Sequence, residues 1–146
     1  MTDPAISALV YRAPMRSRLD SVDWPAAVRR ALDLGICGVG SADDERAERR
    51  LERFLAAPDG SFVWTRDGAG NTYLGRLAGA YRQDTAGRAV DLVHVRDCEW
   101  VRTPVDPAVI PAAITQTFAR GGRNFQQIHP GNVEEETARV WRRLGT

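Results

Sequence analysis

Side chains that could carry out catalysis are scarce in this sequence. His94 and His129 are the only histidines, and there is no Gly-x-Ser-x-Gly elbow, P-loop, Cys-x-x-Cys pair or His-Glu-x-x-His helix. All 20 basic residues are arginine, so a nuclease centre that combines paired carboxylates with a lysine cannot be assembled. Because His94 stands between two valines, we interpret it as a structural or partner-contacting residue. The sequence therefore predicts a binding protein without catalytic residues.

The two cysteines, Cys37 and Cys98, each lie within an apolar, strand-like run. A free cysteine in such a run usually behaves as a small buried hydrophobic side chain. Two cysteines and two distant histidines do not match the ligand spacing of a zinc site. We expect no metal, no cofactor and, in a cytoplasmic protein, no disulfide.

Aromatic side chains suited to binding a planar ring gather in one apolar, β-rich stretch of the chain. They are Trp64, Tyr73, Tyr81 and Trp100. A protein that reads a modified base removes it from its stack and holds it against aromatic faces, at a cost of roughly a few kcal/mol. Each of these residues, taken singly, is more readily explained by core packing. The prediction is that at least two of them line one pocket.

Arginine supplies the second kind of binding chemistry. Its planar guanidinium binds a phosphate or a guanine edge through two parallel hydrogen bonds, whereas lysine offers only a point charge. The exclusive use of arginine also fits a GC-rich genome, and the net charge of +1 argues against a histone-like polyanion binder without excluding a basic face. Glycines in the loop Arg120–Asn124 would let the backbone approach a ligand, or simply end a helix. We predict nucleic-acid backbone contacts from Arg12, Arg16, Arg18, Arg66, Arg76, Arg82, Arg120, Arg123 and Asn124.

Three consecutive β-strands are predicted to carry the aromatic residues. Residues 62–65 are apolar and β-rich, and the turn-forming cluster 67–71 follows them. A second strand is expected over 72–77, continued to residue 82 through a bulge at its glycines. A third is expected from 89 to 101. Such a meander is a plausible scaffold for a binding cleft.

Helices are predicted on both sides of this meander. Pro25 suits the first turn of a helix that Gly35 ends, and a short buried strand follows at 36–39. The clearest helix is expected at 41–57, with Ser41 as its cap, acidic residues in its first turn and a solvated face of ion-paired arginines. Later segments predict a helix at 109–118, a strand at 125–129 and a last helix at 134–144.

The 146 residues predict a single domain over 1–146. Residues 1–20 would form a partly ordered basic arm, or an arm that lies against a phosphate backbone. No apolar run approaches the roughly 20 residues that a membrane span needs, and the first residues lack the features of a signal peptide. We therefore expect a cytoplasmic protein without a membrane partner.

The order of several segments resembles the EVE/PUA-like superfamily. The resemblance rests on GICGVG, FVWTR, YLGRLAGAY, VRDCEWV and RGGRNFQQIH, and it covers roughly residues 24–129. It implies an α+β fold: a small PUA-like β-barrel or a strongly curved mixed sheet with flanking helices. Members of the superfamily include readers of modified bases attached to Type IV restriction nucleases.

The resemblance also implies where a ligand would bind. In EVE/PUA-like domains the pocket opens beside the first strand and the later strands of the barrel, which assigns Gly40, Ser41, Tyr81 and Trp100 to it. The family often has an aromatic residue directly after the first strand, where this chain has Gly40 and Ser41. We expect Trp24 to supply the missing wall.

These features predict a DNA-binding recognition module that flips a modified base, with 5-methylcytosine in double-stranded DNA as the first choice. A nuclease would come from another domain or another chain. One alternative keeps the fold and binds modified or structured RNA, in which case a 2′-hydroxyl contributes to affinity. Another is a protein-interaction or small-metabolite module, which would bind no nucleic acid even at low salt.

Overall fold

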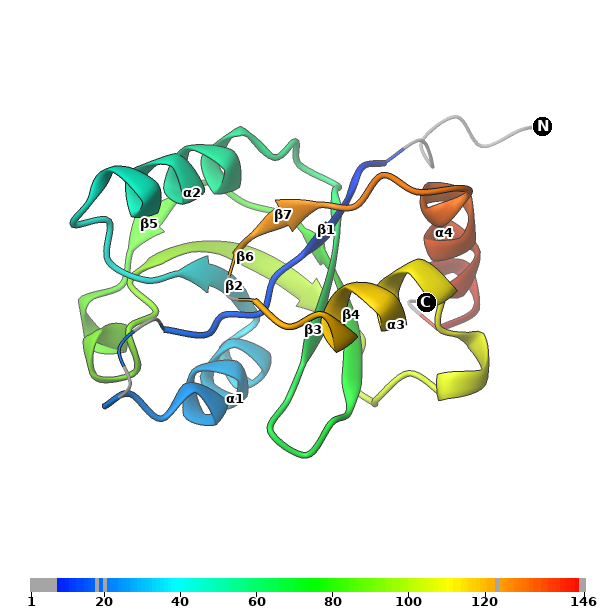
Figure 1. Cartoon of the computed structure of the whole chain (residues 1–146), viewed down its shortest axis with the longest axis horizontal. Coiled ribbons are helices and arrows are strands. Elements are labelled where there is room, and N and C mark those ends of the chain that lie inside the picture. The colour runs from blue at the N-terminus through cyan, green and yellow to red at the C-terminus, as the bar shows by residue number, and fades with distance from the viewer. Residues whose placement is uncertain (1–7, 18, 20, 123, 145–146) are drawn as a thin grey trace.

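The computed structural model describes residues 8–17, 19, 21–122 and 124–144 of the chain (Figure 1). None of the helices in these ranges is long and apolar enough to cross a membrane. Two short 3-10 helices, η2 and η3, accompany the strands and α-helices. The elements follow in this order: β1 (Val10–Arg12), α1 (Trp24–Leu34), β2 (Ile36–Val39), α2 (Glu45–Ala56), β3 (Phe62–Arg66), β4 (Thr72–Leu77), β5 (Arg82–Gln83), η2 (Thr85–Val90), β6 (His94–Trp100), η3 (Pro107–Val109), α3 (Ala112–Ala119), β7 (Gln126–Gln127) and α4 (Val133–Leu144).

The strands form one mixed sheet in the order β2-β6-β4-β3-β1-β7, and β5 also pairs with β6. β1 runs parallel to β3, and the remaining pairs are antiparallel. The fold is therefore α+β: a curled mixed sheet with flanking helices, as the sequence predicted.

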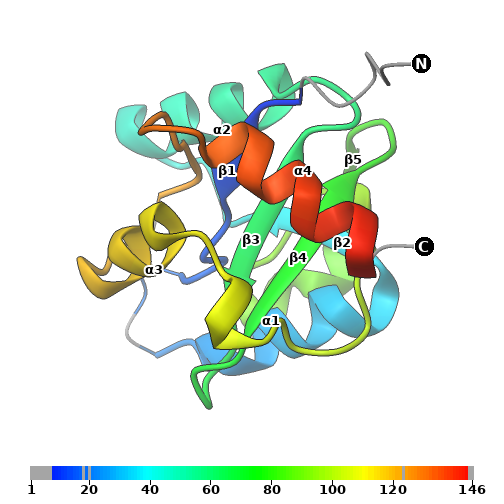
Figure 2. The ribbon, with the colours of Figure 1, turned by 90° about the vertical axis from the view of Figure 1, so that its right-hand side faces the viewer.

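Side chains alternate between the two faces of the sheet, and each face has its own core. Tyr11 and Val63 belong to the core that α1 and α2 cover, whereas Phe62 and Trp64 belong to the core that α3 and α4 cover. In Figure 2, α4 crosses in front of β3 and β4, and α1 and α2 lie behind them. The position of a side chain along its strand thus decides which pair of helices it meets.

The two predicted helices before the central strands are both present. Gly35 ends α1 in the left-handed conformation, with φ 68°, and its N–H donates to Ala31 O. α2 begins later than expected because its cap is Asp44 and not Ser41. The Asp44 carboxylate accepts a hydrogen bond of 2.8 Å from Ala47 N. Ser41 stands before the helix and bonds elsewhere.

The predicted second and third strands are both shorter than the sequence pattern indicated. β4 stops at Leu77, and only Arg82–Gln83 resumes pairing. The segment Thr85–Val90 forms η2, and Asp91 follows it with φ 52°, so β6 begins only at His94. Glycine and aspartate in this part of the chain favour a turn over extended backbone.

Part of the segment predicted as an N-terminal arm belongs to the sheet, where β1 lies between β3 and β7. Arg12 is buried there. Its guanidinium donates to the backbone oxygens of Thr117, Gly121 and Asn124 at 3.0, 2.9 and 3.3 Å. Arg12 therefore holds the end of α3 and the loop after it, and its prediction as a nucleic-acid contact is corrected.

Candidate nucleic-acid interface

The structure separates the aromatic residues that were predicted to line one pocket. Trp64 is fully buried on the face covered by α3 and α4, where its Nε1 donates to Thr137 Oγ1 at 3.2 Å. The alternation of side chains along β3 places it there. Trp64 is a core residue, which corrects its assignment to the pocket.

Tyr73 and Trp100 line an open concavity of about 720 Å³, which we name the Tyr73–Trp100 groove. Trp100 Nε1 donates to Ile36 O at 2.9 Å, and the indole lies against Gly75 of the neighbouring strand. A Cβ atom at Gly75 would stand 2.5 Å from this ring, so the indole occupies the space of a side chain. Trp100 is thus built into the sheet, and Tyr73 is only half-buried.

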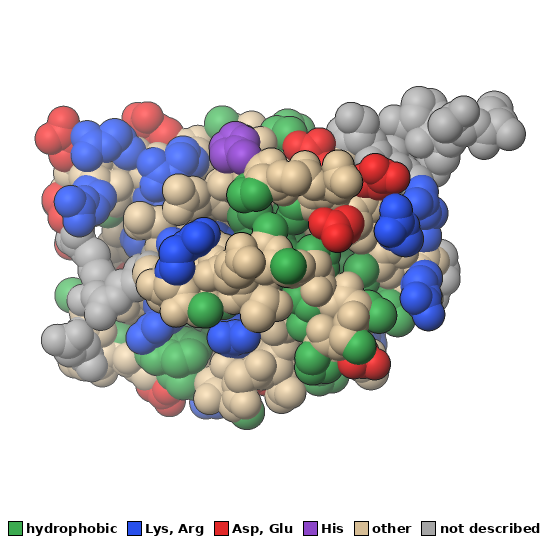
Figure 3. Space-filling view, turned by 45° about the vertical axis from the view of Figure 1, so that its right-hand side comes forward, with side chains coloured by type: hydrophobic (Ala, Val, Ile, Leu, Met, Phe, Trp, Pro, Cys, Tyr) green, Lys and Arg blue, Asp and Glu red, His purple; other side chains and the backbone are tan. Residues whose placement is uncertain are grey.

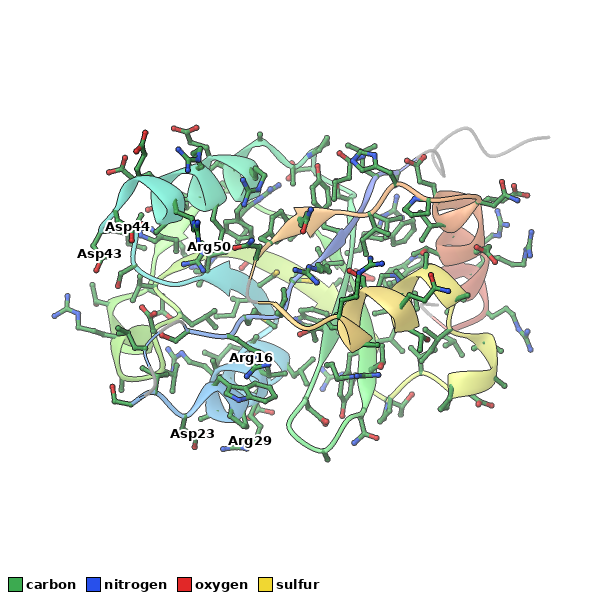
Figure 4. The ribbon with its side chains drawn as sticks, in the orientation of Figure 1. Arg16, Asp23, Arg29, Asp43, Asp44 and Arg50 are labelled. Atoms are coloured by element: carbon green, nitrogen blue, oxygen red, sulfur yellow. The ribbon has the colours of Figure 1, made fainter. Side chains whose placement is uncertain are left out.

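Charges in the Tyr73–Trp100 groove do not favour a polyanion. Its charged lining residues are Arg29, Asp33, Asp67, Glu99 and Arg102. Three acids against two arginines leave one negative charge in excess. Arg29 also pairs with Asp23 at 3.8 Å (Figure 4). A phosphate in this groove would therefore meet more repulsion than attraction.

A second concavity lies at the carboxyl end of β2, and we name it the β2 slot. It is lined by Ala13, Pro14, Met15, Arg16, Gly38, Val39, Gly40, Arg50 and Phe125. Its volume is about 10 Å³, at the lower limit for one water molecule. In Figure 4, Arg50 comes from α2 and Arg16 from the segment after β1. Among the described residues, both charged side chains that line the slot are arginines, whereas the groove has more acids than arginines among its lining residues.

A buried carboxylate ties together the segments that form the β2 slot. Asp91 Oδ1 accepts hydrogen bonds from Ser41 N at 2.9 Å and from Ser41 Oγ at 3.0 Å. Asp91 Oδ2 accepts one from Ser17 Oγ at 2.7 Å. Ser17 directly follows Arg16, and Ser41 directly follows Gly40, so Asp91 holds both walls of the slot.

The same carboxylate fills the place where the EVE/PUA-like resemblance implies an aromatic side chain. A Cβ atom at Gly40 would lie 2.5 Å from Asp91 Oδ2. Local sequence does not reveal that Asp91 belongs to the site, because its partners Ser17 and Ser41 stand 74 and 50 positions away. The only local indication of a polar partner is the pair Gly40 and Ser41 directly after the strand. A glycine leaves space beside the backbone, but the sequence does not indicate which polar side chain fills that space.

Trp24 is connected to the β2 slot through Arg16. The guanidinium carbon of Arg16 stands 4.6 Å from the centre of the Trp24 ring, which is the geometry of a cation–π contact. Arg16 Nε is buried and has no hydrogen-bond partner among the described residues. Met15, just before it, has φ 54°, a conformation that costs a non-glycine residue roughly 1 kcal/mol or more. The planar guanidinium of Arg16 thus covers the ring of Trp24, and its Nε has no hydrogen-bond partner among the described residues.

Tyr81, which the resemblance assigns to the pocket, contacts His94 and is not among the lining residues of the β2 slot. Its hydroxyl lies 2.8 Å from His94 Nδ1, and the two rings stack with centres 5.8 Å apart. Burial lowers the pKa of His94, the charge of Asp91 raises it and that of Arg50 lowers it. The charges of Asp91 and Arg50 therefore act on His94, and Tyr81 contacts that histidine rather than the slot.

Most arginines predicted to bind a nucleic-acid backbone have contacts within the chain. Arg66 lies over an aromatic ring at 5.6 Å, Arg76 donates to a backbone oxygen at 2.9 Å and Arg82 pairs with the carboxylate of Asp97 at 2.7 Å. The predictions for Arg18 and Arg123 lie outside the described residues. Figure 3 shows basic and acidic side chains interspersed over one face of the molecule. Contacts with nucleic-acid phosphates are therefore expected at a few neighbouring residues and not across an extended basic face.

The loop after α3 serves its neighbours within the fold. Gly121 and Gly122 have φ 74° and 108°, and a Cβ atom at Gly122 would stand 2.5 Å from Arg12 Nη2. Both glycines are explained by the approach of Arg12 and by left-handed backbone. Arg120, at the start of the loop, is exposed, and Phe125, just after it, lines the β2 slot. The loop thus borders the site that Arg16 and Trp24 form.

Metal binding has no support in the described residues, where no group of three or more suitable side chains occurs. Burial raises the pKa of Cys37 to about 12 and that of Cys98 well above its ordinary value. Both thiols therefore stay protonated in neutral solution, in which state they are poor ligands and poor nucleophiles.

Comparison with known proteins identifies the fold. No protein-family model matches the sequence, and no curated protein matches it. Among solved structures, the chain is similar to the YTH domain of the Zygosaccharomyces rouxii MRB1 protein in complex with N6-methyladenosine RNA. The sequence identity is 14% and the TM-score is 0.50, and the match covers 91% of this chain and 83% of that chain. It is also similar to protein Atu2648 from Agrobacterium tumefaciens, with 15% identity, 94% of each chain covered and a TM-score of 0.44. The first likeness shows that this chain has a YTH-like fold.

Proposed function

We propose that this chain is a reader of modified nucleic acid, which binds one unstacked, modified base beside Trp24 at the β2 slot. The observation that carries the proposal is the Arg16 guanidinium, 4.6 Å from the Trp24 ring, with its Nε buried and unpartnered among the described residues. A nucleobase is flat, as a guanidinium is, and stacks on aromatic faces. An aromatic platform and a phosphate-binding group therefore stand together.

The fold supports the same class of function by analogy. The YTH domain that shares it was solved with N6-methyladenosine RNA. A fold hosts many functions, so the analogy carries weight only where the chemistry of the site agrees with it. Here the chemistry of the site agrees with the analogy, because an aromatic face, arginine side chains and buried polar groups lie together at the end of β2. The proposal assigns binding to the site and no catalytic step.

The β2 slot has to open before a base can enter, because a volume of about 10 Å³ does not hold a ring. Asp91 fixes Ser17 and Ser41, whereas Met15 is held in a strained conformation with φ 54°. The proposal therefore includes a movement of Met15 and Arg16, in which relief of backbone strain offsets part of the cost of opening.

Two ligands follow from different observations. The sequence favours 5-methylcytosine in double-stranded DNA, and the likeness to the YTH domain favours a modified base in RNA, such as N6-methyladenosine. One buried methyl group contributes on the order of 1 kcal/mol. We therefore expect a modified strand to bind about five- to tenfold more tightly than its unmodified counterpart.

The test is a fluorescence-anisotropy titration with a DNA duplex and a single-stranded RNA, each with and without its modified base. Trp24→Ala should weaken binding of the preferred strand by about 5- to 150-fold, because stacking of one base contributes about 1–3 kcal/mol. Trp100→Phe, in the Tyr73–Trp100 groove, is the matched control and should leave the affinity within about twofold. Thermal unfolding verifies that both variants are folded.

Equal affinity for modified and unmodified strands would contradict a reader and leave a generic nucleic-acid binder. Absence of binding to all four strands at low salt would leave a protein-interaction or small-metabolite module. A loss of affinity in Trp100→Phe but not in Trp24→Ala would move the site to the groove.

A further inference from the structure

Charges on α2 are separated around the helix axis. With about 3.6 residues per turn, Arg46, Arg50 and Arg53 fall on one flank of the helix, whereas Glu48 and Glu52 fall on the other. The buried stripe that packs against the sheet, which includes Arg50, runs between these two sides. We name Arg46, Arg50 and Arg53 the arginine flank. The exposed side of α2 carries the predicted ion pair between Glu45 and Arg49, at 3.4 Å, while its other arginines and glutamates lie to opposite sides of the helix.

The arginine flank turns toward the β2 slot. Arg50 is buried and lines the slot. Arg53, one turn further along, donates from its Nε to Phe125 O at 3.2 Å, and Phe125 also lines the slot. In Figure 4, Arg50 extends from α2 into the molecule, and Asp43 and Asp44 lie at the N-terminal end of the helix.

Contacts at the C-terminal end of α2 fix the position of this flank. Arg96, buried in β6, donates from Nη1 to Phe54 O at 3.0 Å and to Ala57 O at 2.7 Å. Its Nη2 pairs with Asp59 at 2.7 Å. A guanidinium that satisfies the last carbonyl groups of a helix also complements its dipole. The arginine flank is therefore presented on a rigid support.

We infer that the arginine flank of α2 binds the sugar–phosphate backbone of a single strand of nucleic acid at the point where the strand leaves the β2 slot. The inference rests on the proposed function and extends it from the base to the backbone. A guanidinium matches the geometry of a phosphate, and the flank extends about 10 Å along the helix, far enough for a strand to present more than one phosphate. Arg53 contributes more than Arg46, because Asp43 and Asp44 lie near the N-terminal end.

The experiment measures how the dissociation constant of a labelled single-stranded oligonucleotide depends on salt, for the parent chain and for three matched variants. Arg53→Gln and Arg46→Gln remove one charge each from the flank. Arg139→Gln removes a charge from α4, on the other face of the sheet, where Arg139 pairs with Glu135 at 3.4 Å. Each lost phosphate contact should reduce the slope of log affinity against log salt by about 0.7.

We expect a reduced slope and about three- to tenfold weaker binding at low salt for Arg53→Gln, a smaller effect for Arg46→Gln and none for Arg139→Gln. Arg53→Lys should restore the slope, since it restores the charge. Binding with the parent slope in Arg53→Gln and Arg46→Gln, or an equal loss in Arg139→Gln, overturns the inference and leaves the proposed function standing. A parent chain that binds no nucleic acid overturns both.

Discussion

The β2 slot and the Tyr73–Trp100 groove differ in what their side chains have already bound. The groove is large, about 720 Å³, but its tryptophan is committed to a backbone oxygen and to a neighbouring glycine. The slot is nearly closed, about 10 Å³, but Arg16 there lies on Trp24 with a donor unused within the described chain. The size of a concavity therefore does not locate a binding site; the contacts that remain available do.

In each region a glycine, which has no Cβ atom, leaves space that a side chain from another segment fills. Beside Gly75 the space is filled by the indole of Trp100, and beside Gly40 it is filled by the carboxylate of Asp91. The first junction is apolar and joins two strands, so it stabilises the sheet. The second is charged and joins two loops, so it positions the walls of a site. The following substitutions test this division between a structural region and a binding region.

The largest effect is expected at Trp100. Trp100→Ala should lower the free energy of unfolding by about 3–5 kcal/mol, because it leaves a cavity over Gly75 and removes the donor to Ile36 O. Urea denaturation measures the loss, and Trp100→Phe should recover most of it. A loss below about 1 kcal/mol would show that Trp100 does not stabilise the sheet, which would contradict the assignment of the groove as a structural region.

Asp91 should have the next largest effect. Asp91→Ala removes three hydrogen bonds from the junction of Ser17 and Ser41, and we expect it to cost about 2–3 kcal/mol in the free energy of unfolding. Asp91→Asn should cost less, since its amide oxygen still accepts. Urea denaturation of both variants tests this. If Asp91→Ala were as stable as the parent, the two walls of the slot would be held by something else.

Acid should destabilise the region around the slot through His94. Burial holds the pKa of His94 below its ordinary value of 6.5, with Asp91 raising it and Arg50 lowering it. The unfolded chain therefore binds the proton more readily, and stability falls as the pH drops through about 6.5 toward the pKa of the folded state. Urea midpoints at about pH 7.5 and pH 5.5 should differ more in the parent chain than in His94→Gln. The same difference in both would exclude His94 as the cause.

The smallest effect is expected at Tyr73. Tyr73→Phe removes only the contact between its hydroxyl and Asp67 Oδ2 at 3.4 Å, on a half-buried side chain. The free energy of unfolding should change by less than about 0.5 kcal/mol, and the affinity for nucleic acid should not change. A tenfold weaker affinity would show that the groove takes part in binding.

Patterns within a few residues of one another predicted much of the fold. Gly35 indicated the end of α1, because only a residue without Cβ adopts its left-handed conformation at no cost. The short strand after α1 follows from the local pattern of apolar residues. The acidic first turns and basic last turns of α2 and α4 match the helix dipole and mark where these helices begin and end. The resemblance to the EVE/PUA-like superfamily stays a prediction, although the curled mixed sheet with flanking helices that it implied is present.

Only the tertiary structure decided which residues meet. Sequence alone supplied Trp64, Tyr73 and Trp100 as one group of aromatic residues, but strand pairing sends Trp64 to one face and uses Trp100 to cover a glycine. It supplied Arg12 as a phosphate contact, but that arginine bonds a loop more than a hundred positions away. Residue types and short-range spacing determine helices, turns and the kind of chemistry available. Which charges are neutralised and which remain for a ligand depends on contacts between distant segments, and those form only when the sheet brings the segments together.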